Sequence, residues 1–61
     1  MDPRSLREKL DKLGMSQREL ARKLGVTDRA VRYWIEGKNR IPAWLKSWLE
    51  MYEKLNPPPA D

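Results

Sequence analysis

Three glycines divide the chain into short segments, and this division constrains the fold more than any other feature. Gly14, Gly25 and Gly37 each follow a stretch of residues with helical periodicity. Glycine often ends a helix, because it adopts the left-handed backbone conformation without a steric penalty. The chain can therefore form only short helices, and such helices are stable only when they bury their apolar faces against one another.

Capping residues mark where these helices begin. Asp2 and Thr27 are typical N-cap residues, whose side chains accept hydrogen bonds from the first amides of a helix. Ser16 and Glu19 have capping-box spacing, in which each side chain accepts from the backbone amide of the other residue. Pro42 is placed to open a fourth helix, because a first turn does not need its missing N–H. We predict an all-α, compact four-helix domain with helices at about residues 3–13, 17–24, 28–36 and 42–55.

The chain is long enough for one small domain. Its 61 residues include no cysteine and no histidine, so disulfides and thiolate metal sites are excluded as stabilising elements. A domain of this size buries only about 60% of the surface of its unfolded chain, so close packing must supply the stability. We expect residues 1–55 to form the domain and the proline-rich segment 56–61 to be a flexible tail.

The positive charge is concentrated in the middle of the chain. The net charge is +4, from 13 basic and nine acidic residues. The window 16–40 holds seven of the basic and three of the acidic residues, whereas the rest of the chain has six of each. A surface that faces a polyanion requires such a local excess. Ordinary solvated charge is the alternative, and charge alone does not separate the two.

The segment 28–36 carries two different faces within nine residues. At about 100° per residue, Val31, Trp34 and Ile35 fall on one side of a helix. The opposite side carries polar residues: Asp28, Arg29, Arg32, Tyr33 and Glu36. The apolar side can attach the helix to a core. The polar side has groups that match base edges in the DNA major groove, arginine for guanine and aspartate for cytosine.

A solvated helix face is the alternative interpretation of this segment. Asp28 would then only complement the helix N-terminus and pair with Arg32 one turn later. The preceding turn argues against it, because residues 25–27 connect two helices so briefly that the helices must cross steeply, as in a helix-turn-helix motif. Ala21 supplies the small side chain that such a crossing needs, opposite Val31.

The segment MSQRELARKLGVTDRAVRYWIEGKNRIP resembles the lambda-repressor-like (Cro or XRE type) helix-turn-helix domains. The resemblance covers residues 4 to about 55 and lies in the spacing of Ala21, Gly25 and Val31, in Gln17 at the start of the second helix, and in Trp34, Gly37, Lys38 and Pro42. It implies a sequence-specific double-stranded DNA-binding domain whose third helix lies in the major groove.

The resemblance also implies two groups of site residues. Bases would be read by Asp28, Arg29, Arg32 and Tyr33. Asp28 would discriminate either by repelling misplaced phosphates or by accepting from cytosine, and Tyr33 would contact a thymine methyl group or a phosphate. Phosphates would be held by Ser16, Gln17 and Arg18 at the start of the second helix, and by Lys38, Asn39 and Arg40 in the loop 37–41. Elementary electrostatics agrees, because helix N-termini bind anions and loop cations neutralise phosphate.

Two features depart from the family pattern. Many members form an internal ion pair between helix 1 and the end of helix 3, where this chain has Leu10 and Ile35; such an apolar replacement is often neutral or stabilising. Members that dimerise on DNA usually continue into a fifth helix, whereas prolines follow Leu55 here, so we expect a monomer. Full capping and a regular core also fit an engineered or trimmed version of such a domain.

The aromatic residues of the fourth helix support an alternative function. Trp44, Trp48 and Tyr52 lie on one stripe and could dock a partner of a small helical protein-interaction module. Aromatic residues at helical spacing usually belong to a core, which is the interpretation we favour for Trp48. Trp44 lies at the edge of the stripe, where we expect partial exposure beside the DNA backbone.

An enzyme is not expected from this composition. Catalysis needs a sheltered pocket with a nucleophile or paired carboxylates, and histidine and cysteine are both absent. No apolar run approaches the roughly 20 residues that cross a bilayer, and the charged N-terminus is not that of a signal peptide. We expect a cytoplasmic protein, nucleoid-associated if bacterial or phage in origin, that uses no cofactor, metal, membrane or small-molecule substrate.

Overall fold

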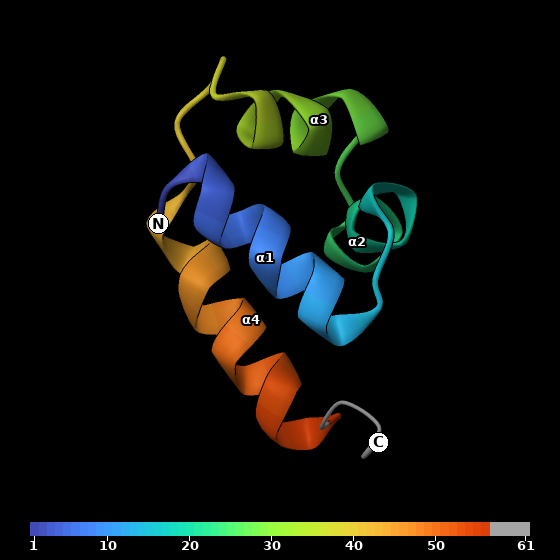
Figure 1. Cartoon of the computed structure of the whole chain (residues 1–61). Coiled ribbons are helices and arrows are strands. Elements are labelled where there is room, and N and C mark those ends of the chain that lie inside the picture. The colour runs from blue at the N-terminus through green and yellow to red at the C-terminus, as the bar shows by residue number, and fades with distance from the viewer. Residues whose placement is uncertain (57–61) are drawn as a thin grey trace.

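The computed structural model describes residues 1–56, and four α-helices account for most of them. The helices are α1 (Pro3–Leu13), α2 (Gln17–Leu24), α3 (Asp28–Glu36) and α4 (Ala43–Leu55) (Figure 1). Residues 1–56 contain no strand, so the prediction of an all-α four-helix domain is confirmed. Residues 57–61, which make up most of the tail predicted at 56–61, lie outside the described residues.

The helix boundaries are set by local hydrogen bonds that the sequence indicates. Asp2, Ser16 and Thr27 each accept a hydrogen bond from the amide three residues later, at 2.7–3.1 Å. Gly25, which follows α2, has a φ of +74°, and its amide donates to the carbonyl of Ala21. A residue with a side chain would be strained in this left-handed conformation. Glycine therefore allows α3 to begin directly after a short turn.

Two predicted details are wrong. Pro42 does not occupy the first turn of α4: its backbone is extended (φ −63°, ψ 144°), and its carbonyl accepts from the amide of Leu45 at 3.1 Å, so it is the N-cap. The capping box is only half formed. Ser16 accepts from the amide of Glu19, but no bond returns from the Ser16 amide to the Glu19 carboxylate among the hydrogen bonds of residues 1–56. Glu19 is exposed, so water can solvate its carboxylate instead.

The apolar faces of the helices meet in one core. The buried side chains are all apolar: Leu6, Leu10, Met15, Leu20, Ala21, Val31, Trp34, Ile41, Leu45 and Leu49. No polar or charged side chain is buried in the part of the chain that the structure describes. Ala21 and Val31 are both almost completely buried, as the predicted close crossing requires. Figure 1 shows this crossing, with α2 viewed nearly along its axis and α3 lying across it.

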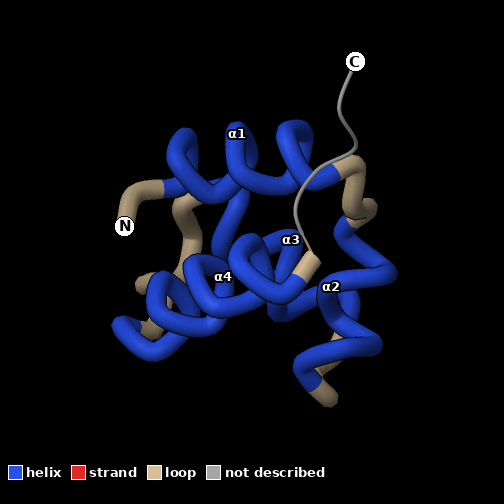
Figure 2. The backbone as a smooth tube through the Cα atoms, turned by 90° about the horizontal axis from the view of Figure 1, so that it is seen from below, coloured by secondary structure: helices blue, strands red, loops and turns tan. Residues whose placement is uncertain are grey.

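α1 and α4 complete the domain. α3 packs against α1 as well as against α2. α1 and α4 begin at the same end of the molecule and run in similar directions (Figures 1 and 2). Lys9 of α1 and Glu53 of α4 form a half-buried ion pair, with Nζ 3.0 Å from Oε1. Within residues 1–56 no helix has the length and apolar character needed to cross a membrane.

Asp2 should make the stability of the fold depend on acidic pH. The hydrogen bond from the Ser5 backbone amide lowers the pKa of the Asp2 carboxyl below its ordinary value of 3.8. A lowered pKa in the folded state stabilises the fold above the unfolded pKa, and this contribution is lost as the pH falls through the folded pKa. Asn also caps helices but does not titrate, so we expect Asp2→Asn to lose less stability than the wild type below about pH 4. Urea unfolding of both proteins at about pH 7 and about pH 3 measures the difference; equal losses would contradict the prediction.

Candidate nucleic-acid interface

The residues of α3 divide between the core and the surface. On the inner side, Val31 is fully buried and Trp34 is only 7% exposed. The other side holds the four predicted base-reading residues: Asp28, Arg29 and Arg32 are exposed and Tyr33 is half-buried. The helical period therefore placed these four side chains at the surface correctly, because the inner residues fix the rotation of the helix about its axis.

Asp28 pairs with α2 and not with its own helix. Its Oδ2 lies 3.7 Å from Arg18 Nε. The pairing with Arg32 that the helical spacing offered is not among the ion pairs of residues 1–56. Within the same residues, Arg29 and Arg32 have no carboxylate partner, and both are exposed. Two guanidinium groups on the outer side of α3 are thus available to a ligand.

Tyr33 belongs to α3 and contacts the loop that follows this helix, through its backbone carbonyl and through its ring. Its carbonyl accepts from the amides of Lys38 at 2.9 Å and Asn39 at 3.4 Å. Lys38 Nζ lies 5.2 Å from the centre of the Tyr33 ring, and Arg32 Cζ lies 6.0 Å from it, both within cation–π range. Lys38 Nζ is also 3.4 Å from a carboxylate oxygen of Glu36. Sequence reasoning assigned Lys38 to phosphate alone and missed these contacts, which arise from the turn at Gly37.

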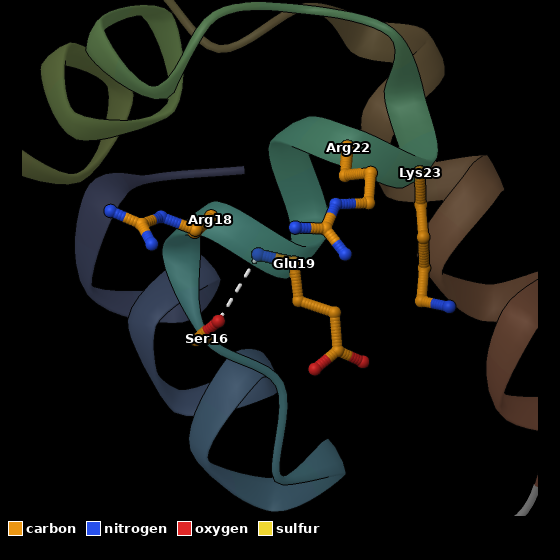
Figure 3. A pocket seen from close by; sticks show the side chains of 5 residues that line it. All are labelled: Ser16, Arg18, Glu19, Arg22 and Lys23. Atoms are coloured by element: carbon orange, nitrogen blue, oxygen red, sulfur yellow. Dashed lines mark hydrogen bonds between the residues drawn. The ribbon is translucent and has the colours of Figure 1, made fainter.

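Exposed polar and basic residues lie at both ends of α2. Ser16 and Gln17 are exposed, and the Ser16 Oγ is engaged with the Glu19 amide (Figure 3). Arg22 and Lys23, which sequence reasoning did not assign to the site, line a shallow hollow with residues 16, 18 and 19. Figure 3 shows Arg18 pointing away from Arg22 and Lys23. The two cations could have been found from the charge window, but their direction depends on how α2 packs.

The loop 37–41 presents its three predicted phosphate-binding residues to solvent. Lys38, Asn39 and Arg40 are all exposed, and Ile41 anchors the end of the loop in the core. The loop and residues 1–3 line a common hollow. The position of residues 1–3 beside this loop was not predicted, because the two segments are far apart in the sequence and no local pattern connects them.

The aromatic residues of α4 take different positions. Trp48 and Tyr52 stack on each other, with ring centres 5.3 Å apart, and both pack partly against the core. Lys23 Nζ lies 5.6 Å from the centre of the Tyr52 ring. Trp44 is 51% exposed and meets Trp34 edge-to-face, with ring centres 6.3 Å apart. The prediction of partial exposure for Trp44 is confirmed, whereas Trp48, predicted in the core, packs against the core but is only partly buried.

The chain departs from the pattern of similar domains at Leu10 and Ile35, and both residues contribute to the core or pack against it. Leu10 is buried, Ile35 packs partly against the core, and both line one shallow hollow with Arg7 and Gln17. Apolar side chains therefore stand at both of these positions and line the same hollow.

Comparison with known proteins identifies the family. A family model described as helix-turn-helix matches residues 6–43. The match runs from α1 to the first residue of α4 and includes the turn 25–27 and all of α3. Searches of the curated proteins and of the solved structures gave no significant match. The matched segment covers more than half of the chain, and the chain belongs to the helix-turn-helix family of lambda-repressor-like (Cro/XRE-type) DNA-binding domains.

Proposed function

We propose that this domain binds double-stranded DNA sequence-selectively, with α3 in the major groove. The observation that carries the proposal is the state of Arg29 and Arg32. Both are exposed on the outer side of a helix whose inner side is buried, and neither has a carboxylate partner within residues 1–56. An α-helix fits the major groove, and arginine donates two hydrogen bonds to O6 and N7 of guanine.

The other residues of α3 extend this reading surface. Asp28 can accept from the amino group of cytosine. The half-buried Tyr33 ring can contact a thymine methyl group, and its hydroxyl can instead donate to a phosphate. Four side chains on nine residues of helix match the few base pairs that one recognition helix spans, so we propose that a monomer reads about one half-site.

Phosphate contacts on two sides would fix the helix in the groove. Ser16 and Gln17 lie at the start of α2, where unpaired backbone amides and the positive end of the helix dipole favour an anion. Arg18 adds a cation there, and Lys38, Asn39 and Arg40 supply exposed donors from the loop 37–41. These contacts would position the protein without reading sequence.

Salt dependence tests the proposal. Three cationic phosphate contacts, from Arg18, Lys38 and Arg40, would lower the affinity for duplex DNA roughly 40-fold between 50 and 200 mM salt, because each neutralised phosphate releases nearly one counterion. Fluorescence anisotropy with labelled duplexes selected by the protein from a random pool measures this dependence. Docking of a protein partner through Trp44, Trp48 and Tyr52, the alternative function, would be much less sensitive to salt. A duplex affinity that hardly changes over this range would contradict the proposal.

A further inference from the structure

The ion pair between Arg18 and Asp28 joins the beginnings of two helices. Arg18 is the second residue of α2, and Asp28 is the first residue of α3. Both side chains are well exposed, at 79% and 62%, so the pair contributes little to stability in water. It lies on the surface that also carries Arg29 and Arg32, where a bound duplex would exclude water and strengthen its effect.

The helix dipole gives no reason for an arginine at position 18. A cation in the first turn faces the positive end of the dipole, which is unfavourable. The positive end of the α3 dipole favours a carboxylate, so Asp28 fits the start of that helix. Its carboxylate is the anion that Arg18 Nε faces at 3.7 Å. Arg18 therefore compensates a carboxylate that the phosphates of a bound duplex would otherwise repel.

The pair also leaves one carboxylate oxygen free to read a base. Oδ2 of Asp28 faces Arg18 Nε at 3.7 Å, and neither carboxylate oxygen accepts a side-chain hydrogen bond within residues 1–56. An ionised carboxylate accepts through both oxygens. The major-groove donor that a carboxylate matches is the amino group of cytosine. Repulsion of misplaced phosphates would need an uncompensated charge, so the ion pair favours the base-reading role of Asp28.

We infer that Arg18 is a positioning residue that determines specificity through Asp28. It faces and orients the carboxylate, so that Asp28 accepts from a cytosine amine and the protein prefers a C·G pair at that place in its site. This inference rests on the proposed function of α3. It gives Arg18 a role that a phosphate ligand does not have, because a phosphate ligand weakens binding to all sequences alike.

A double-mutant cycle tests the inference. The wild type, Arg18→Gln, Asp28→Asn and the double variant are titrated with the duplex that the wild type selects from a random pool, and with duplexes in which each base pair is replaced in turn. We expect Asp28→Asn to reduce discrimination about tenfold at one C·G pair. Arg18→Gln should reduce it at least about threefold at the same pair and at no other, and should add nothing in the Asp28→Asn background.

Arg22→Gln is the matched control, because Arg22 is exposed one turn later on α2 and has no ion pair within residues 1–56. It should leave discrimination at every base pair unchanged. The inference is overturned if Arg18→Gln weakens all duplexes by one factor, or if its effect persists undiminished beside Asp28→Asn. If the wild type selects a preferred sequence but the Asp28→Asn variant discriminates between duplexes as well as the wild type does, this inference alone is overturned. Failure of the wild type to select any sequence would overturn the proposed function as well.

Discussion

The Trp34→Ala variant should lose about 3–5 kcal/mol of unfolding free energy, the usual effect of removing a buried tryptophan side chain. Trp34 is only 7% exposed and attaches the inner side of α3 to the core. A domain of 61 residues has a total stability of roughly 3–9 kcal/mol. We therefore expect the variant to be marginally stable or unfolded at room temperature. Urea titration followed by far-ultraviolet circular dichroism measures the loss.

Trp44→Ala is the matched control for this prediction. Trp44 contacts Trp34 edge-to-face but is 51% exposed, so its removal returns much less apolar surface to water. We expect a loss of about 1.5 kcal/mol or less, because about half of the side chain is already solvated in the folded state. If the two variants were equally destabilised, α3 would not be anchored through Trp34, and the division of this helix into an inner and an outer side would be wrong.

The Arg29→Ala and Arg32→Ala variants should each lose about 1–3 kcal/mol of binding free energy for the selected duplex. Each should also lose its preference at one particular G·C pair, because the removed guanidinium group is the donor that distinguishes guanine. Stability should hardly change, since both residues are exposed and have no ion pair within residues 1–56. Anisotropy titrations with the selected duplex and its single-pair replacements measure both effects.

Two kinds of control accompany the arginine variants. Lys38→Ala and Arg40→Ala should weaken binding to all duplexes by similar factors and reduce the salt dependence by about one counterion each. Lys46→Ala, which removes an exposed cation from α4, should change neither affinity nor preference. Uniform weakening by Arg29→Ala and Arg32→Ala, with every base preference retained, would contradict the assignment of these two residues to base reading.

The nine residues of α3 carry both the inner side that packs in the core and the outer side that we propose reads bases, and the helical period couples the two. A rotation of α3 by one residue, about 100°, would turn Arg32 toward the core and expose Val31. Burial of Val31 and Trp34 therefore fixes the direction of Arg29 and Arg32 without touching either arginine. The stability of the core and the direction of the proposed reading surface are set by the same contacts.

Contacts between elements were the part of the site that sequence reasoning missed. Lys38 was assigned to phosphate, but its backbone and ammonium group also hold Tyr33. The partner of Asp28 was sought on its own helix, where spacing offers Arg32, and was found on α2 at Arg18. Position along one helix can be counted from the sequence. Distance between side chains of two helices depends on the angle at which the helices cross.

The sequence by itself determined the helices, their limits and the residues of each face. Asp2, Ser16 and Thr27 act on amides three residues away, and Gly25 acts on its own backbone, so these effects are local and need no knowledge of the fold. Only the tertiary structure decided which charged groups meet and which segments share a hollow. The physical reason is that these outcomes follow from packing between segments distant in the chain, where small shifts in orientation exchange one partner for another.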